Sequence, residues 1–379
     1  MNRKTKNFYD FDIHNIVGIR VITPTESDLK LILNYYGEHE KELNREPDIT
    51  IKFIDLLEIP NLIFIGLENA GFNKDGYYIL SSGRSKLKVK IPFEKIGQPL
   101  EIICQSGSPG IPLLNHIVNL SFLSKNYIPL HASAFRYNKK NAVVMGWSKG
   151  GKTESLLAFG NKDAEYIGDE VVMLSEHGDE MFGIPAAVTV WEWQFKQVPK
   201  LIPKLSKNKK SLFSLIHFIE SVYNFLKKTF LKNSFVTKVI AEALPSFKRQ
   251  LNFRVTPKFI FKEKIYNEKA YPDKVILIMS HDSEEIKVES CSIDEVINRM
   301  INSHEYEMST FIQHYNTFKF AFPHLKSQFL ENVNKHQSEL LKTALAGKEA
   351  FKVLHPYPVS FEKLFEKMKI IFDEKDLLS

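Results

Sequence analysis

Cysteine is scarce in this sequence of 379 residues, and the two that occur, Cys104 and Cys291, lie far apart. Their number and spacing exclude a disulfide-rich scaffold and a zinc site built from cysteines, and they are typical of a reducing cytosol. No uninterrupted apolar run reaches the length of about 18 residues that a transmembrane helix needs. Residues 1–15 carry no apolar stretch after their basic residues, so no signal peptide is expected. We therefore predict a cytoplasmic protein.

A surplus of one charge is also missing from the chain as a whole, whose formal net charge is only +6. The positive charge is concentrated between residues 195 and 250, where twelve Lys or Arg residues stand against two acids. This segment alone carries +10, so the rest of the chain is slightly acidic. The basic excess therefore belongs to one segment and does not describe a generally basic protein.

The length of the chain predicts two domains, or one large domain with additions. The composition, 44% apolar and 25% charged, is that of a globular protein. Residues 1–126 show short strand patterns, turns and one early helix at 27–37, which predicts a strand-rich N-terminal domain. Residues 127–379 predict a second domain with a basic helical insertion at about 195–250. The expected fold class is α/β.

One motif carries most of the functional information. Residues 146–153 read Gly-Trp-Ser-Lys-Gly-Gly-Lys-Thr and match the phosphate-binding pattern G-x-x-x-x-G-K-[ST] at every position. An apolar strand is expected before it, at 141–145, and a helix after it, at 154–159. A strand that turns on glycine into a helix start directs backbone N–H groups at an anion. We therefore predict a nucleotide-phosphate site; the alternative is an ordinary helix start after glycine.

The residues of this motif predict separate roles. Lys152 is expected to reach the β- and γ-phosphates, and Thr153 to offer its hydroxyl to Mg²⁺. Asp169 and Glu170 are the candidates for a metal ligand or proton acceptor, because they are expected at the start of the next strand, within 163–174. The alternative for this pair is a solvated strand end. The expected nucleotide-binding residues are Gly146, Trp147, Ser148, Lys149, Gly150, Gly151, Lys152, Thr153 and Glu154.

A GTPase is excluded, because no N-K-x-D motif follows the loop at the required distance. His131 lies in a stretch, 128–135, that is expected to form one hydrophobic strand before the loop strand. An isolated histidine is commonly a structural residue, and that alternative stays open for His131 and for the nearby Ser133.

With these positions in place, the stretch from His131 to Leu174 resembles the catalytic core of HPr kinase/phosphorylase and of related HPr-kinase-like small kinases. In that family a histidine precedes a glycine-rich loop that ends G-K-[ST]-E, and an acidic pair follows. The matching positions here are His131, the loop 146–153, Glu154 and the pair Asp169-Glu170. The resemblance implies a P-loop kinase core of the HPr kinase / PEP carboxykinase type, with ATP and Mg²⁺ as cofactors.

The resemblance also implies roles for these residues. Asp169 would be the general base or a metal ligand, Glu170 would bind or support the metal, and His131 would lie near the transferred phosphate. Lys149 stands where the family usually has glycine, and Glu170 replaces a second aspartate. The implied reaction is transfer of the ATP γ-phosphate to a hydroxyl of a protein, a peptide or a small molecule. The alternative is an ATP-binding module that switches a partner interaction with little or no transfer.

The basic segment allows three interpretations. A helix at 212–231 is dense enough in apolar residues to be mostly buried, and a helical hairpin packed on the core is one interpretation. A helix on a membrane surface is the second, and a site for an acidic partner or nucleic acid is the third. Strands are expected on either side, at 187–193 and 257–261. A homo-oligomer is also among the expected assemblies.

Overall fold

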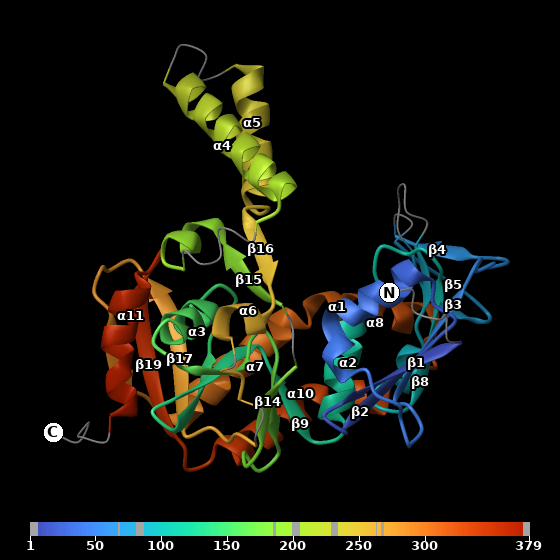
Figure 1. Ribbon diagram of the computed structural model, residues 1–379. Helices are drawn as coiled ribbons and strands as arrows, with labels where there is room; N and C mark the ends of the chain where they lie inside the picture. Colours follow the sequence, from blue (N-terminus) through green and yellow to red (C-terminus); the bar gives the residue numbers. More distant parts are fainter. Residues whose placement is uncertain are drawn as a thin grey trace. The chain divides into compact units, whose positions relative to one another are not determined.

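The computed structural model describes residues 7–66, 69–80, 87–184, 187–198, 205–228, 234–262, 264–266 and 269–373, and it is a mixed α/β protein (Figure 1). The chain divides into two compact units. The first consists of residues 1–186 together with 265–379, and the second of residues 187–264. The boundary expected at residue 126 does not coincide with a division between units, whereas the basic insertion expected at about 195–250 lies within the second unit.

An eight-stranded sheet forms the N-terminal part of the first unit, in the order β1-β2-β3-β8-β7-β6-β5-β4. Neighbours pair antiparallel except for β2 with β3 and β3 with β8, which are parallel. The strands are β1 (Phe8–Ile13), β2 (Val17–Ile22), β3 (Ile49–Ile54), β4 (Ile63–Ile65), β5 (Ala70–Asn73), β6 (Gly76–Leu80), β7 (Lys88–Lys90) and β8 (Leu100–Gln105). The sequence predicts turns at residues 73–76 and at Ser82-Gly83; the first joins β5 to β6, and the second lies outside the described residues.

Helices α1 (Glu26–Tyr36), α2 (Leu114–Leu123) and α8 (Ser309–Ala321) share one hydrophobic core with this sheet. A capping box between Thr25 and Asp28 starts α1. Helix α8 contributes Phe311, which is fully buried. Because α8 comes from the C-terminal half of the sequence, the N-terminal sheet and the later residues form one unit.

A six-stranded sheet, in the order β12-β10-β11-β17-β19-β18, carries the glycine-rich loop. Its centre is parallel, because β17 pairs in parallel with β11 on one side and β19 on the other. The strands are β10 (Ala132–Tyr137), β11 (Lys140–Met145), β12 (Glu165–Gly168), β17 (Lys274–His281), β18 (Lys287–Ser290) and β19 (Glu349–Pro356). The loop leaves β11 and enters α3 (Lys152–Gly160), as the motif predicts.

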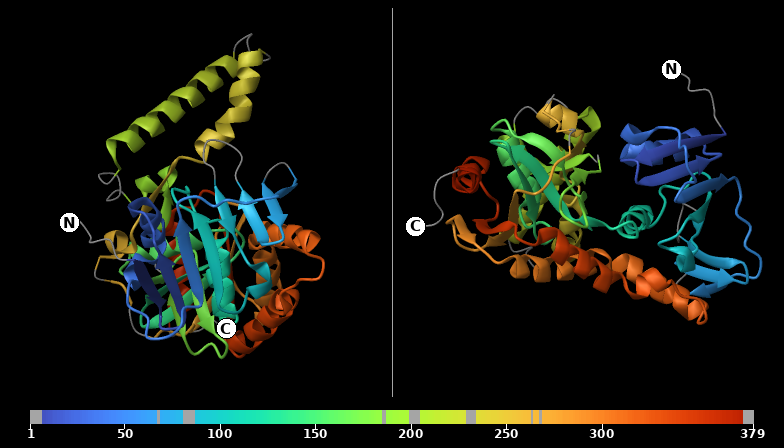
Figure 2. Two further views of the ribbon diagram at one scale, coloured as in Figure 1. Left: turned by 90° about the vertical axis from the view of Figure 1, so that its right-hand side faces the viewer. Right: turned by 90° about the horizontal axis from the view of Figure 1, so that it is seen from below.

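Helices cover both faces of this sheet (Figure 2). Val143 and Leu277 pack in one cluster with α7 (Ile293–Glu307) and α10 (Val333–Leu345). Because side chains alternate along a strand, Phe135 points to the opposite face, where its ring stacks on Phe159 of α3. Helix α11 (Phe361–Met368) packs beside α3, and the short α9 (Gln328–Glu331) precedes α10.

A separate three-stranded sheet, in the order β14-β13-β9, consists of β9 (Tyr127–Leu130), β13 (Val172–Ser175) and β14 (Met181–Gly183). The single strand expected over 128–135 is therefore wrong, because the chain passes from β9 in this sheet to β10 in the six-stranded sheet at His131. The second expectation that fails concerns Asp169 and Glu170. They lie in the link from β12 to β13, where the chain returns from the six-stranded to the three-stranded sheet, and not at the start of a strand.

The second unit contains a strand pair and a helical hairpin. β15 (Val188–Trp191) pairs antiparallel with β16 (Asn252–Val255). The strand expected over 187–193 ends at Trp191, because residues 192–196 form a 3₁₀ turn. The strand expected at 257–261 is wrong, because Pro257 starts the short helix α6 (Pro257–Phe261). Proline is well suited to a first helical position, where its missing N–H has no partner to lose.

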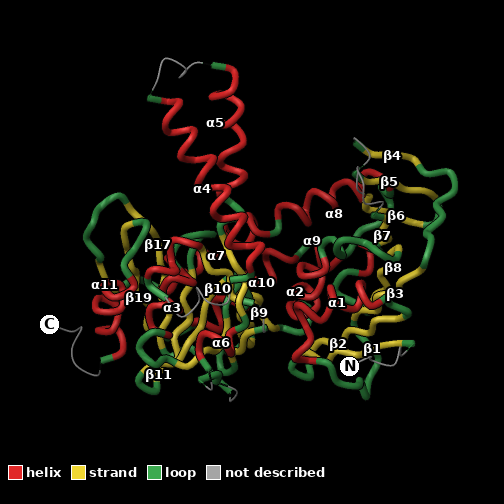
Figure 3. Tube along the Cα trace, turned by 45° about the horizontal axis from the view of Figure 1, so that its top comes forward, coloured by secondary structure: helices red, strands yellow, loops and turns green. Residues whose placement is uncertain are grey.

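The hairpin consists of α4 (Lys207–Lys227) and α5 (Phe235–Lys248), both drawn as helices in Figure 3. The mostly buried helix expected at 212–231 is wrong in its burial, because only Phe213 and Ile216 of α4 are buried. Phe218 and Phe225 are 66% and 68% exposed. Apolar density therefore predicted the helix and not its environment. No helix in the described ranges combines the length and apolar character that would let it cross a membrane.

Aromatic packing joins α3 to α11 and predicts where the first unit is most sensitive. The ring of Phe159 lies 4.6 Å from Phe135, 5.0 Å from Phe365 and 5.1 Å from Phe372, between ring centroids. Phe159→Ala is expected to lower the free energy of unfolding by about 3–5 kcal/mol, because it leaves a cavity behind the loop helix. Urea denaturation measures it. Phe320→Ala on α8 is the control, since that ring is 72% exposed, and equal losses in both variants would contradict the packing assignment.

Candidate active site

The glycine-rich loop lies against the ends of two strands of the parallel sheet. A Cβ on Gly146 would come within 2.3 Å of the carbonyl oxygen of Ile278 on β17. A Cβ on Gly151 would come within 2.2 Å of Nε2 of His355 on β19, and the φ of Gly151 is +112°. His355 is fully buried, and its Nε2 donates to the carbonyl oxygen of Gly150 at 2.9 Å. Both motif glycines are therefore required by close approach to the sheet.

Lys149, the residue in place of the usual glycine, occupies a backbone conformation that glycine adopts freely. Its φ is +62°, in the left-handed region, and its side chain is exposed. A non-glycine residue in this region carries a cost of roughly 1–2 kcal/mol. Glu170 shows the same feature, with a φ of +66°. Two of the expected site residues therefore hold strained backbone.

The side chain of Lys152 is folded back onto its own loop. Its Nζ donates to the carbonyl oxygens of Gly146, at 3.1 Å, and Trp147, at 2.8 Å. Burial lowers the pKa of Lys152, and the nearby carboxylates of Glu170 and Glu307 oppose that shift. Within the described part of the chain, this buried ammonium donates to carbonyl oxygens and forms no ion pair. It is therefore suited to an incoming anion.

Asp169 is the best-connected acid of the site. Its Oδ1 accepts hydrogen bonds from the hydroxyls of Ser133, at 2.5 Å, and Thr153, at 3.2 Å. Burial raises the pKa of Asp169 to about 7, with repulsion from Glu170 as the second cause, while the bonds from Ser133 and Thr153 act in the opposite direction. The structure thus ties the acid directly to the last residue of the motif, 16 residues earlier.

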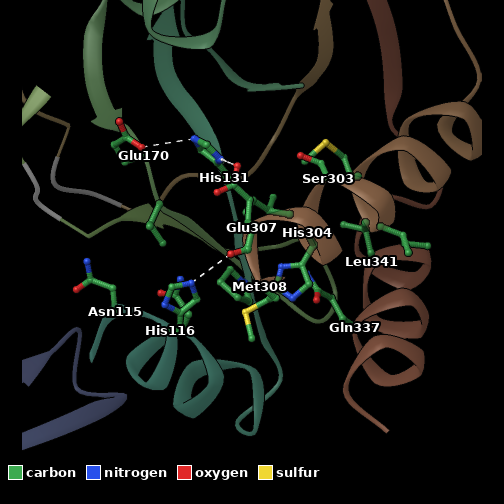
Figure 4. A pocket seen from close by; sticks show the side chains of 16 residues that line it. Asn115, His116, His131, Glu170, Ser303, His304, Glu307, Met308, Gln337 and Leu341 are labelled. Carbon is green, nitrogen blue, oxygen red and sulfur yellow. Dashed lines mark hydrogen bonds and ion pairs between the residues drawn. The ribbon is translucent and has the colours of Figure 1, made fainter. Parts of the chain in front are cut away.

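His131 lies between two acids (Figure 4). Its Nδ1 lies 2.6 Å from Oε1 of Glu307, and its Nε2 lies 3.4 Å from Oε2 of Glu170. Burial lowers the pKa of His131, but its hydrogen bonds with Glu170 and Glu307 outweigh burial, and the net shift is upward. The bond with His131 in turn lowers the pKa of Glu307. The three groups form a charged cluster beside Lys152.

The remaining loop residues occupy the rim. Trp147 is 47% exposed, and its ring lies 4.7 Å from that of Tyr306, at the end of α7. Ser148 is half-buried, and Glu154 is buried in the first turn of α3. The last turn of α7 therefore contributes an aromatic ring and, through Glu307, a carboxylate to the surroundings of the loop.

The structure brings together all the residues expected from the sequence: the loop 146–153, Glu154, His131 and the Asp169-Glu170 pair. Two further contributors, Glu307 and His355, were not expected. Glu307 lies 176 residues from its partner His131, and His355 lies 205 residues from Gly150. No local spacing links either to the motif. The one available signal is local: a cap at Ser292 marks the start of the helix that ends at Glu307, and His355 directly follows the largely apolar stretch 351–354.

The hydroxyl of Thr153 and the carboxylate of Asp169 are ligand types that suit Mg²⁺ bound together with a nucleotide. Across the described residues, no cluster of three or more His, Cys, Asp and Glu side chains forms a cage for a metal ion. Mg²⁺ needs no such cage, because it keeps several waters and binds through one or two carboxylates together with substrate phosphates. Thr153 and Asp169, hydrogen-bonded side by side at the loop, provide that smaller set.

No family model and no curated protein matches the chain. Its function is therefore inferred from the loop and from the acidic group around it.

The strain at Lys149 leads to a stability prediction. Lys149→Gly is expected to raise the free energy of unfolding by about 0.5–1 kcal/mol, because relief of the left-handed strain exceeds the added freedom of the unfolded chain. Gly151→Ala, two residues on, is expected to lower it by about 1–3 kcal/mol through collision with His355. Urea denaturation compares them. A Lys149→Gly variant no more stable than the wild type would refute the strain.

The acid pair around His131 leads to a second prediction. Glu307→Gln is expected to lower the pKa of His131, because it removes a carboxylate that stabilises the protonated ring. NMR titration of the histidine ring signals measures the shift. Glu305→Gln is the matched control on the same helix, since Glu305 contacts Asn334 instead. An unchanged His131 midpoint in Glu307→Gln would show that the pair does not set its protonation.

Proposed function

We propose that the protein is an ATP- and Mg²⁺-dependent phosphotransferase with a core of the HPr kinase type. One observation carries the proposal: a buried carboxylate, Asp169, accepts a hydrogen bond from Thr153 of a complete phosphate-binding loop and has its pKa raised to about 7. Loop and acid supply the two halves of a transfer reaction, one for the phosphate and one for the proton of the acceptor.

The loop would bind the triphosphate. Backbone N–H groups of residues 146–153 and the start of α3 provide donors for phosphate oxygens. Lys152 would exchange its carbonyl partners for the β- and γ-phosphates, which are stronger acceptors. Thr153 and Asp169, with support from Glu170, would hold Mg²⁺, which neutralises charge on the phosphates during transfer.

Asp169 would act as the base. A bond forms between the acceptor oxygen and the γ-phosphorus, the bond from that phosphorus to the bridging oxygen of ADP breaks, and the hydroxyl proton moves to the Asp169 carboxylate. Oδ1 already accepts from Ser133, so Oδ2, which lies 3.3 Å from the Thr153 hydroxyl, is the oxygen that would take the proton. A base with a pKa near 7 suits a reaction at neutral pH.

His131 would stabilise the transferred phosphoryl group. Its raised pKa favours the protonated ring, and Glu307 fixes the ring orientation through Nδ1. The Nε2 side, 3.4 Å from Glu170, is the side on which a phosphate oxygen would be met. The partners follow from this chemistry: a nucleotide and a hydroxyl-bearing acceptor. The competing function is an ATP-dependent switch without transfer, which would have no use for a base with this pKa.

The proposed base predicts both a variant and a pH profile. Asp169→Asn is expected to keep ATP binding by calorimetry and to lose about 10²–10⁴-fold in transfer. The loss is measured as the rate of ADP formation from ATP with small hydroxyl compounds, such as glycerol and L-serine, as acceptors. In the wild type, kcat/KM is expected to rise with pH through a midpoint set by Asp169, because the base acts only when deprotonated; bound Mg²⁺ would lower this midpoint below the pKa of about 7 that burial gives the metal-free carboxyl.

The causes of that pKa predict how the midpoint moves. Glu170→Gln removes a repelling charge and is expected to lower the midpoint, whereas Ser133→Ala removes a bond to the charged form and is expected to raise it. Opposite shifts support Asp169 as the titrating base, and undiminished transfer by Asp169→Asn would exclude it.

The two candidate functions also differ in outcome. ATP binding without ADP formation in the presence of any acceptor would favour the switch. Absence of ATP binding would contradict both functions.

A further inference from the structure

A pocket of about 150 Å³ adjoins the charged cluster of the candidate site (Figure 4). His131, Glu170 and Glu307 belong to both the pocket wall and the cluster. Helices α2, α7 and α10, strand β9 and the linking residues Val171 and Met308 supply the rest of the wall. The volume is far above the roughly 10–15 Å³ that a single water requires, so the pocket has room for a small molecule.

Three buried polar atoms of this wall have no hydrogen-bond partner among the described residues: Oγ of Ser303, Nε2 of His304 and Oε1 of Gln337. Ser303 and Gln337 are 2% and 6% exposed. Buried polar groups in folded proteins are nearly always satisfied, and leaving one unpaired costs about 1–3 kcal/mol. Three such side chains gather along one pocket, where ordered water or a bound ligand can supply their partners.

The chemistry of the wall selects the class of ligand. Among the described residues that line the pocket there is no Lys or Arg, so a phosphorylated or carboxylated ligand would find no fixed cation away from the catalytic cluster. Burial lowers the pKa of His304 to about 4, so its ring is neutral at physiological pH. Gln337 Oε1 only accepts, whereas a serine hydroxyl and a neutral imidazole offer either role. Hydroxyl groups match all three, because each donates and accepts.

The polar groups approach from more than one direction. Ser303 and His304 lie on α7 and Gln337 on α10, while Asn115 and Asn119 lie on α2. Oδ1 of the Asn115 side chain accepts from the hydroxyl of Tyr36, and this bond holds the side-chain amide in place. The single hydroxyl of a serine in a protein or peptide acceptor would pair with only one of the three atoms on Ser303, His304 and Gln337. A molecule with several hydroxyls around a small carbon skeleton satisfies several at once, and the apolar side chains of Leu130 and Met300 face its C–H groups.

We infer that this pocket binds the phosphoryl acceptor, and that the acceptor is a small uncharged polyol of the sugar or cyclitol class. The inference rests on the proposed phosphotransfer function. One hydroxyl would face the γ-phosphate beside His131, lose its proton to Asp169 and become a phosphate monoester, with ADP as the leaving group. The other hydroxyls would pair with Ser303, His304 and Gln337.

The test uses the full chain with ATP, Mg²⁺ and a fixed panel: myo-inositol, glucose, glycerol, L-serine, a seryl peptide and glucose 6-phosphate. ³¹P NMR identifies any phosphate monoester, and saturation-transfer NMR measures binding of each compound without ATP. We expect binding and phosphorylation of at least one uncharged polyol, with glucose 6-phosphate inert. Phosphorylation of the seryl peptide alone, or of no compound while ADP is released to water, would overturn the polyol assignment.

Variants test the wall. Gln337→Leu and Ser303→Ala are expected to raise the KM for the polyol about 3–10-fold each, the loss of one hydrogen bond, with the ATP affinity and kcat nearly unchanged. Lys342→Leu is the matched control on the exposed side of α10. Unchanged polyol KM values in both wall variants would overturn the site.

The kinase proposal and the acceptor proposal can fail separately. A wild-type protein that does not bind ATP would contradict the kinase proposal. Polyol binding without any transfer, in a protein that does bind ATP, would contradict the acceptor role alone.

Discussion

The candidate site depends on one constraint of topology, the two points at which the chain passes between sheets. Strand β9 pairs with β13 in the three-stranded sheet, and β10 pairs with β12 in the six-stranded sheet. The links from β9 to β10 and from β12 to β13 therefore run side by side. His131 lies in the first link and the Asp169-Glu170 pair in the second. Residues in such links escape the strict alternation of a strand, so they can converge beside the loop that leaves β11.

Strain concentrates at the same place. Lys149 and Glu170 both take positive φ, and outliers of this kind persist only where their surroundings determine the conformation. For Lys149, the surroundings are a loop held by contacts of Gly146 with β17 and of Gly151 with β19. For Glu170, they are β12 and β13, which the link must join although each is paired within a different sheet. A loop fixed by the sheet in this way keeps its N–H groups in place, and under the proposed function a phosphate would bind without reordering it, which is the physical basis of preorganised binding.

The predictability of these features from sequence follows their range along the chain. The loop 146–153 was recognisable because strand, glycine turn and helix are local, and Asp169 because it follows closely. Glu307 and His355 were not, because their positions are set by the packing of α7 and by the register of β19 against β17. The burial of α4 was predicted wrongly for a related reason. Periodicity identifies an apolar face, whereas what covers that face is decided by tertiary structure.

The balance of charges around the loop bears on the choice between the proposed phosphoryl transfer and nucleotide binding alone. The charged cluster of His131, Glu170 and Glu307 lies beside Lys152, and the carboxylate of Asp169 is a third acid near that ammonium. A binding module for a free triphosphate would gain from removing those acids, because each repels the phosphates. Acids next to a phosphate loop become favourable where a cation accompanies the nucleotide, and in the proposed transfer one of them also takes up a proton. In the proposed reaction Asp169, buried and hydrogen-bonded to two hydroxyls, is placed for the second purpose.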